Sequence, residues 1–314
     1  MNADDELRKE AGKPAQPVSS ASLKIASWAA RWLPDSVKNA LYRTGPLARL
    51  IRSRLNRAAP QGLTEVKVAA GELAGLRLAL DLQSEKEYWL GTYEPALQAA
   101  LRALVRPGMV AYDVGANIGY ITLMFRRLVG KSGRVFAFEA LPENVERLRR
   151  NIELNREKYF QGFDSEVTIF SGAVVDRSGP VSFILGPSNS MGKAEGSAER
   201  HSAEGYKRVE NAQAIEVAGI SLDEFVYQEG NPPPQVVKID IEGGEALALP
   251  GMRHVLDEAR PLVLIELHGA EAARVAWTTL QQAGYRICHM APGFPPVAGL
   301  EALGRKAYLA AFNP

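Results

Sequence analysis

The sequence is poor in several features that mark special classes of protein. It contains one cysteine, Cys288, so no disulfide can form within the chain. No apolar run approaches the ~20 residues of a membrane-spanning helix, and residues 1–18 lack the apolar centre of a signal peptide. A formal net charge of +1 gives no overall field to attract nucleic acid. We therefore expect a cytoplasmic protein that does not bind nucleic acid.

What remains is an ordinary globular composition. Hydrophobic residues make up 46% of the chain and charged residues 23%. A length of 314 residues is enough for one large α/β domain with an appendage. We predict a disordered tail over residues 1–20, a basic amphipathic helical extension over 21–60, a small β-hairpin over 61–86, and the main domain over 87–314.

The extension at residues 21–60 has two interpretations. Between residues 23 and 57, eight lysines and arginines face a single acid, Asp35, and tryptophans and leucines supply an apolar side. The simpler interpretation is a helix that packs on the main domain with its arginines in water. The alternative is a peripheral contact of residues 23–57 with the inner face of an anionic membrane.

Strand-like and helix-like segments alternate through the main domain. We predict strands at 109–114, 135–139, 167–170, 236–241 and 262–267, an extra strand at 181–185, helices at 95–105, 120–129, 142–155, 245–258 and 271–283, and a closing pair of strands at 285–290 and 306–312. Apolar strands alternating with helices predict a mostly parallel sheet covered on both faces, ending in a C-terminal antiparallel hairpin. Residues 186–212, rich in Ser, Gly and charge, predict a surface insert that could close over the site.

A glycine-bearing turn connects the first core strand to a helix. It contains Gly115 and Gly119 but lacks the third glycine of G-x-G-x-x-G, through which a pyrophosphate approaches the backbone. Asp113, at the end of the strand, would repel a pyrophosphate and attract a sulfonium group. This combination predicts a site for a cationic nucleoside, of which S-adenosylmethionine is the common example.

The next predicted strand also ends in an acid, Glu139, 24 positions after Gly115. That spacing is close to the ~20 residues at which an acid meets the ribose in dinucleotide folds. The third strand offers Ser171 and Ala173, which are small enough to lie against a planar base. We therefore place the ribose and base beside Glu139.

Acids and a histidine follow the fourth and fifth strands. Asp240 and Glu242 are predicted to share one face, as are Glu266 and His268. Such a cluster can supply a general base, for which we nominate His268 or Asp240, or it can hold a divalent cation that polarises a substrate hydroxyl. Glu245 is expected only to cap the following helix.

One proline-rich segment resembles a signature of amino-group methyltransferases without matching its position. Residues 231–234 read Asn-Pro-Pro-Pro but precede the fourth strand, where that signature follows it. The segment is therefore interpreted as a rigid loop, and oxygen is favoured over nitrogen as the methyl acceptor.

Taken in order, these motifs resemble the FkbM family of S-adenosylmethionine-dependent methyltransferases. The resemblance extends over about residues 87–269 and is carried by the segments 91–94, 113–120, 138–140, 238–243 and 266–268, with Pro142, Asn144, Asn151 and Asn155. It departs at Ala140, where a proline commonly follows the acid.

The resemblance implies a Rossmann-like class I methyltransferase fold and O-methylation of a sugar, glycan or polyketide-type metabolite. It implies that Asp113, Gly115, Asn117 and Glu139 bind the cofactor. We extend the predicted cofactor set to Glu94, which would hold the methionine ammonium, and to Gly119, Tyr120, Asn144, Ser171, Ala173 and Asp240. The predicted catalytic set is His268, Asp240 and Glu242.

Two alternatives remain at this level. The chain could be a non-catalytic cofactor-binding scaffold that acts through its basic N-terminal segment, or an NAD(P)-dependent oxidoreductase. The sequence leaves the acceptor, the need for a metal and the oligomeric state open.

Overall fold

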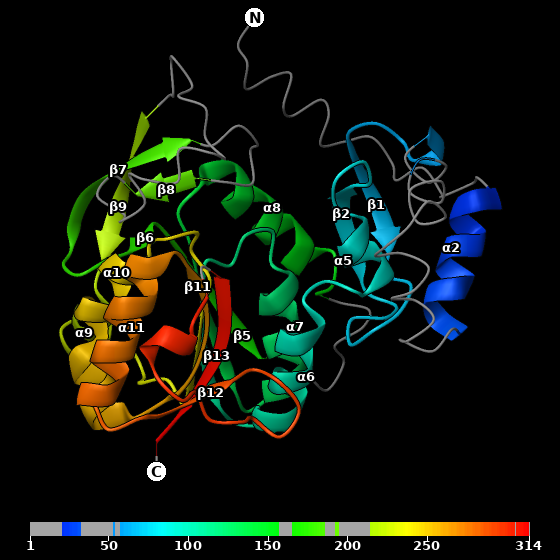
Figure 1. The fold of residues 1–314 in the computed structure, drawn as a ribbon. Coiled ribbons are helices and arrows are strands. Elements are labelled where there is room, and N and C mark those ends of the chain that lie inside the picture. The colour runs from blue at the N-terminus through cyan, green and yellow to red at the C-terminus, as the bar shows by residue number, and fades with distance from the viewer. Residues whose placement is uncertain are drawn as a thin grey trace, which may run out of the picture. The chain divides into compact units, whose positions relative to one another are not determined.

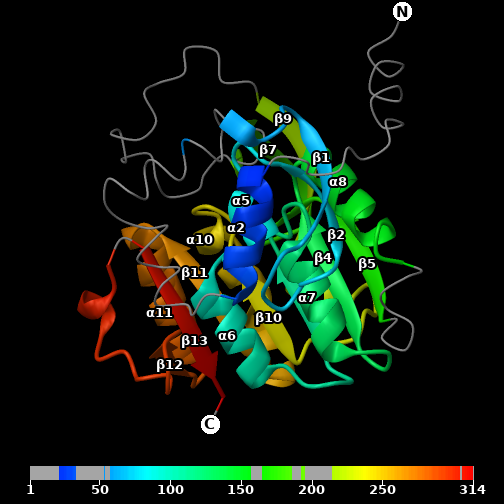
Figure 2. The ribbon, with the colours of Figure 1, turned by 90° about the vertical axis from the view of Figure 1, so that its right-hand side faces the viewer.

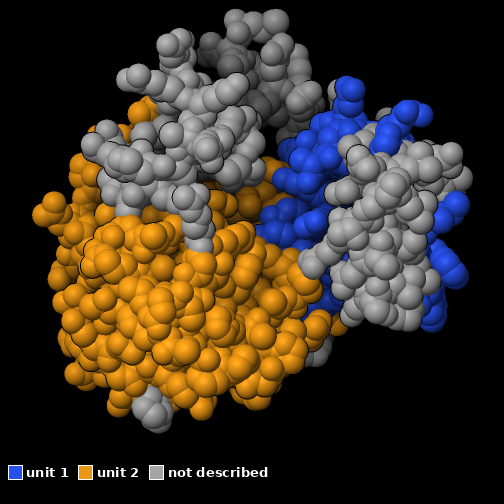
Figure 3. Space-filling view, in the orientation of Figure 1, with its two compact units in different colours: residues 1–93 blue, residues 94–314 orange. Residues whose placement is uncertain are grey.

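The computed structural model describes residues 21–32, 53, 57–156, 165–185, 192–194, 214–304 and 306–313. It divides into two compact units, residues 1–93 and 94–314, coloured separately in Figure 3. The predicted tail 1–20 lies outside the described residues, as do most of the extension beyond residue 32 and most of the insert 186–212. The predicted domain ranges therefore stay predictions.

The first unit contains helices and a small two-stranded sheet among its described residues. Helix α2 spans Ala21–Trp32, strands β1 (Leu63–Lys67) and β2 (Arg77–Asp81) pair antiparallel, and the short helix α5 covers Lys86–Leu90. Leucines on and beside the hairpin form its buried side. At the close of this unit, the left-handed backbone of Gly91 brings it so near Ala70 that a Cβ atom would lie 2.0 Å from the Ala70 carbonyl oxygen.

The second unit is built on a seven-stranded sheet among its described residues. In spatial order the strands are β12 (Arg286–His289), β13 (Lys306–Phe312), β11 (Leu262–His268), β10 (Val236–Ile239), β3 (Val110–Val114), β4 (Arg134–Glu139) and β5 (Glu166–Ser171). The five strands from β11 to β5 run parallel, and β13 runs antiparallel to both of its neighbours. The predicted Rossmann-like sheet with a C-terminal antiparallel pair is confirmed.

Helices cover both faces of this sheet, as Figures 1 and 2 show. On one face lie α6 (Pro95–Leu104), α7 (Tyr120–Val129) and α8 (Pro142–Glu153), and on the other lie α10 (Glu245–Ala248) and α11 (Ala270–Gln282). The strands are apolar because they are buried on both sides. Tyr112 and Phe138 on adjacent strands meet with ring centroids 5.4 Å apart and anchor the core.

A second sheet contains residues 214–220, a strand that the sequence analysis did not predict. Its order is β6 (Ala173–Val174), β9 (Ala214–Ile220), β7 (Gly179–Leu185) and β8 (Gly192–Ala194). The extra strand predicted at 181–185 belongs here, paired antiparallel with β9. Helix α9 (Leu222–Tyr227) follows, and the Ser221 hydroxyl caps it by accepting the Glu224 amide.

The helix predicted at 245–258 is broken in the structure. Helix α10 ends at Ala248, a 3₁₀ turn covers Leu249–Met252, and a π turn covers Val255–Ala259. Pro250 has no amide to donate to the preceding turn. Gly251 packs so tightly that a Cβ atom there would lie 2.2 Å from the Val175 carbonyl oxygen. These two residues break the regular periodicity.

Candidate active site

The carboxyl ends of the central parallel strands gather the predicted site residues at one edge of the sheet. Strand β10 lies between β3 and β11. In this register Lys238 stands opposite Asp113 on β3 and opposite Leu264 on β11. The strand β10 ends at Ile239, two residues earlier than predicted, because Glu242 and Gly243 adopt left-handed backbone angles, φ 52° and 96°, and turn the chain. Asp240 and Glu242 are therefore positioned by a turn, whereas the prediction placed them on one face of a strand.

Gly115 allows the ends of β3 and β10 to approach each other. Its φ is +76°, and a Cβ atom at this position would lie 1.9 Å from the Asp240 carbonyl oxygen. The amides of Gly115 and Ala116 both donate to the Phe138 carbonyl at the end of β4, at 2.9 Å. The glycine turn thus joins the tips of three strands.

Asp113 is fully buried beneath this turn, and its charge is paired. Its Oδ1 lies 3.3 Å from the Lys238 Nζ, and its Oδ2 accepts the Thr122 hydroxyl at 2.6 Å. The Lys238 ammonium also donates to the carbonyls of Gly115, at 2.7 Å, and Val114, at 3.2 Å. The sequence analysis predicted that Asp113 attracts a sulfonium group. The structure pairs Asp113 with Lys238, which holds two carbonyls of the turn, and the role of Asp113 in cofactor binding stays a prediction.

Glu139 sits at the tip of β4 with its carboxylate held from two sides. Its Oε2 accepts the Asn117 amide at 2.7 Å, and its Oε1 accepts the Leu141 amide at 2.9 Å and the Asn144 side-chain amide at 3.4 Å. Burial raises the pKa of Glu139 above its usual value, and these hydrogen bonds offset part of that rise. The carboxylate is thereby preorganised, and each oxygen keeps capacity to accept a further donor.

The remaining predicted cofactor residues surround this turn at different depths. Gly119 precedes α7 with φ +92°, and the Tyr120 side chain, the first of that helix, is buried. Ser171 is the register partner of Glu139 on β5, and Ala173 belongs to the second sheet. The roles of these residues in cofactor binding stay predictions.

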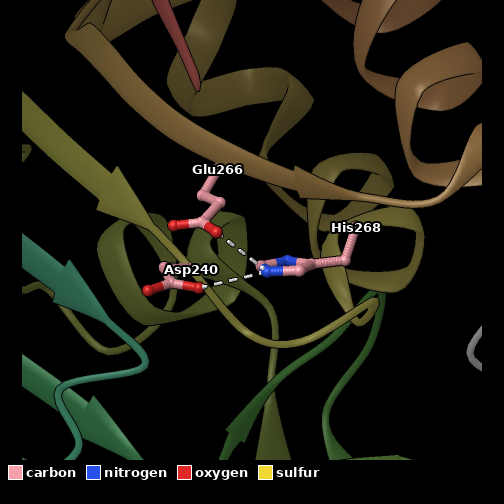
Figure 4. Close-up of side chains that lie close together, drawn as sticks. All are labelled: Asp240, Glu266 and His268. Carbon is pink, nitrogen blue, oxygen red and sulfur yellow. Dashed lines mark ion pairs between the residues drawn. The ribbon is translucent and has the colours of Figure 1, made fainter. Parts of the chain in front are cut away.

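His268, the last residue of β11, lies among four carboxylates. Its Nδ1 is 3.0 Å from the Glu245 Oε1, and its Nε2 is 3.1 Å from the Glu266 Oε1. Longer approaches connect the Nε2 to the Glu242 Oε2, at 3.8 Å, and to the Asp240 Oδ1, at 4.0 Å. Figure 4 shows Asp240 and Glu266 directed at the imidazole from neighbouring strand ends.

This environment changes the protonation of the cluster. Burial disfavours a charged imidazole, but hydrogen bonds to Glu245 and Glu266 and the charges of Glu245 and Glu242 raise the pKa of His268 to about 10. Burial raises the pKa of Asp240 to about 6, although the charge of Lys238 opposes it. At neutral pH the histidine is therefore protonated and the Asp240 carboxylate is largely ionised.

A metal ion would have to compete with that proton. Among the described residues, Asp240, Glu266 and His268 form the group whose ligand atoms, all within 4.8 Å of one another, could hold a cation. Coordination by the imidazole requires its neutral form. The Glu266 carboxylate is also engaged by the Lys306 ammonium.

A small pocket lies beside this cluster. Its volume is about 10 Å³, room for about one water molecule. The polar residues among those that line it are Glu94, Lys238, Asp240, Glu266 and Tyr308, but the surface that they and their neighbours present is almost entirely apolar. Glu94, predicted to hold an ammonium group, precedes α6 and contributes to this lining.

Three residues of the site were missed or undervalued by the sequence analysis. Lys238 is a charged residue within a strand that is otherwise apolar, a signal that a buried partner must exist nearby. Glu245 was expected only to cap a helix, but its carboxylate is fully buried against His268. Lys306 begins β13, and only the pairing of β13 with β11 reveals its proximity to Glu266.

The helices among the described residues are too short or too polar to cross a membrane.

Comparison with known proteins gives a consistent result. The profile named Methyltransferase FkbM domain matches residues 113–287. The chain is 28% identical over 200 residues to the hexuronic acid methyltransferase AglP of Haloferax volcanii, covering 63% of this chain and 73% of that protein. It is 44% identical over 52 residues to a protein-L-isoaspartate O-methyltransferase of Methanothrix thermoacetophila. That match covers 17% of this chain and 25% of that protein.

A solved structure of an FkbM methyltransferase from Methylobacillus flagellatus aligns at 17% identity with a TM-score of 0.41. The alignment covers 75% of this chain, which spans 56% of that one.

Proposed function

Because the chain belongs to the FkbM methyltransferase family, we propose that it is an S-adenosylmethionine-dependent O-methyltransferase acting on a hydroxyl of a sugar, glycan or polyketide-type metabolite. The observation that carries the proposal is the placement of Asp240. This partly exposed carboxylate follows β10, and its backbone carbonyl packs against the glycine turn between β3 and α7. A base and a nucleoside-type turn thus meet at one edge of the sheet.

The residues present fit the proposed cofactor. The Glu139 carboxylate, fixed by the amides of Asn117 and Leu141, can accept two ribose hydroxyls at once. Glu94 and Asp240 supply negative charge near the turn, which suits an ammonium and a sulfonium group. When bound, this cofactor supplies an electrophilic methyl group whose sulfur leaves with the bonding electron pair.

Asp240 serves as the general base in this proposal. Its carboxylate takes the proton of the acceptor hydroxyl as the oxygen forms its bond to the methyl carbon. His268 was the leading candidate in the sequence analysis. With its pKa raised to about 10, the imidazole already carries a proton and cannot accept another at neutral pH. It acts as a positioning residue that holds the carboxylates of Glu245 and Glu266 in place, and the half-exposed Glu242 lies 3.8 Å from its Nε2.

The charge of the site bears on the acceptor. Four carboxylates surround one imidazolium, and the nearby Lys306 is committed to Glu266. A neutral hydroxyl can approach this cluster, whereas an acceptor with its own carboxylate meets repulsion. The relative named a hexuronic acid methyltransferase supports only the sugar class of the acceptor, because a hexuronic acid carries the kind of carboxylate that this cluster would repel. For this chain we propose a neutral ring hydroxyl.

Two measurements test the proposal. Calorimetry with S-adenosylmethionine and with NADH should show binding of the former, and binding of NADH alone would instead make the chain an oxidoreductase. Mass spectrometry of glycans and metabolites from cells with and without the protein should reveal a product heavier by ~14 Da, one added CH₂. Cofactor binding without transfer to any acceptor would favour the scaffold alternative.

A further inference from the structure

Helix α2 (Ala21–Trp32) carries its large apolar side chains on the outside. Ile25, Trp28 and Trp32 are 67%, 60% and 66% exposed, whereas Ala26, Ala29 and Ala30 are buried. The spacing of the exposed three, i, i+3 and i+7, places them in one stripe along the helix. An amphipathic helix that served only to pack on its own unit would direct the tryptophans inward.

Such a stripe is costly in water and favourable at a lipid interface. Scattered exposed apolar residues are normal, but a continuous stripe with two tryptophans marks a contact surface. The indole ring is amphipathic and prefers the level of the lipid headgroups. The guanidinium of Arg31 lies 5.7 Å from the centroid of the Trp32 ring, so a cation accompanies the apolar stripe.

The charge of the surrounding sequence points to one kind of partner. Residues 21–60 contain eight lysines and arginines and one acid, a net charge of +7. Since the whole chain has a net charge of +1, the remaining residues carry −6. The positive charge is therefore concentrated in the part of the sequence that contains the exposed stripe, and positive charge is complementary to an anionic surface.

We propose that α2 docks the protein on anionic lipid, with Ile25, Trp28 and Trp32 entering the interfacial layer and Arg31 contacting the headgroups. This goes beyond the proposed methyl transfer and does not depend on it. A helix lying in the interface needs no spanning segment.

Vesicle sedimentation of the full-length protein tests the proposal. Vesicles of phosphatidylglycerol and phosphatidylcholine in equal parts should pellet the protein, and phosphatidylcholine alone should pellet it at least about tenfold less, because the electrostatic attraction is lost. The double variant W28S/W32S should weaken binding to the anionic vesicles at least about tenfold, since the apolar insertion is lost. Leu63→Ser, which changes another large exposed apolar side chain of the same unit, is the matched control and should bind like the parent.

Equal pelleting of the parent and W28S/W32S, or no pelleting of the parent, would overturn the proposal. Because Trp28, Trp32 and Leu63 are all exposed, the circular dichroism spectrum and the melting temperature of both variants should match those of the parent. The competing occupant of the stripe is a second copy of the chain. Lipid-free analytical ultracentrifugation that finds a dimer in the parent and a monomer in W28S/W32S would replace the lipid with that partner.

Discussion

At the scale of single residues, the proposed general base of the cluster is Asp240, and His268, the first candidate from the sequence, becomes a positioning residue. Sequence alone gives an isolated histidine a pKa near ~6.5, which suits a general base. The sequence predicts acids near this histidine, but it does not give the close contacts that Glu245 and Glu266 make with the two ring nitrogens. They turn the histidine into a fixed cation and leave the partly exposed Asp240 as the group that can still accept a proton.

Replacing Asp240 by asparagine should lower kcat by about 10²- to 10⁴-fold, the usual contribution of a positioned general base. The dissociation constant of S-adenosylmethionine should rise far less than kcat falls. The melting temperature should not fall, because burial already disfavours the ionised carboxylate. Asp176→Asn, at an exposed acid of the same unit, is the control. Comparable kcat values for D240N and the parent would remove Asp240 from the mechanism.

The pH dependence of kcat/KM should follow Asp240. A base works only when ionised, so the rate should fall as pH decreases through about 6, the raised pKa of this carboxyl. His268 should not produce an acidic limb, because it stays protonated until about pH 10. Initial rates between pH 5 and pH 9 at saturating cofactor check this assignment. A profile that rises toward lower pH would contradict it.

A third expectation at this scale concerns metal. Incubation with EDTA followed by gel filtration should leave methyl transfer unchanged, since the proton on His268 already offsets part of the negative charge that a cation would neutralise. Activity lost on chelation and restored by Mg²⁺ or Mn²⁺ would show instead that Asp240, Glu266 and His268 hold an ion during turnover.

At the scale of elements, the turn between β3 and α7 is the most constrained feature of the site. Gly115→Ala forces a Cβ atom to within 1.9 Å of the Asp240 carbonyl oxygen and also imposes a left-handed backbone. We expect a loss of at least about 3 kcal/mol in the free energy of unfolding, together with loss of cofactor binding.

Gly284→Ala provides the matched control for this turn. Gly284 has a similar φ, +78°, but no atom lies within 4 Å of the position that an alanine methyl group would take, so only the backbone penalty of about 1–2 kcal/mol applies. Urea unfolding and calorimetric titration of both variants measure the difference. Equal destabilisation by the two substitutions would mean that the contact with Asp240 is unimportant.

Regular periodicity determined which elements were predicted well. Helix α7 and strand β13 begin and end where the sequence analysis placed them, because each combines an apolar pattern with clear flanking signals. Strand β9 was missed because it follows a polar segment and pairs with β7 in a second sheet. The break after α10 was missed because the apolar pattern continues through Pro250.

The site was predicted to the same extent as the elements that position it. The order of parallel strands follows from alternation, so the meeting of Asp240, Glu266 and His268 at one edge was foreseeable. The pairing of Lys238 with Asp113 could not be foreseen. It depends on the register of two strands in which these residues stand opposite each other although they lie 125 positions apart in the chain. Long-range register is set by tertiary packing and leaves no local pattern.

At the scale of the whole molecule, the sheet depends on a strand contributed from far along the chain. Strand β13 lies between β11 and β12, and three of its residues, Leu309, Ala310 and Ala311, are fully buried. Removing residues 305–314 should abolish cooperative unfolding of the second unit. Removing only Asn313 and Pro314, which follow β13, should preserve it. Thermal denaturation followed by circular dichroism distinguishes the two, and a cooperative transition in the longer truncation would contradict the expectation.

This placement of β13 has a consequence during synthesis. As β11 leaves the ribosome, the side of it reserved for residues 306–312 presents bare amides and carbonyls, and it stays so while the intervening segment 269–305 is made. The nascent chain therefore passes through an interval in which an apolar strand edge is open to other chains. Slowed translation after residue 268 should lengthen that interval, and with it the demand for chaperones.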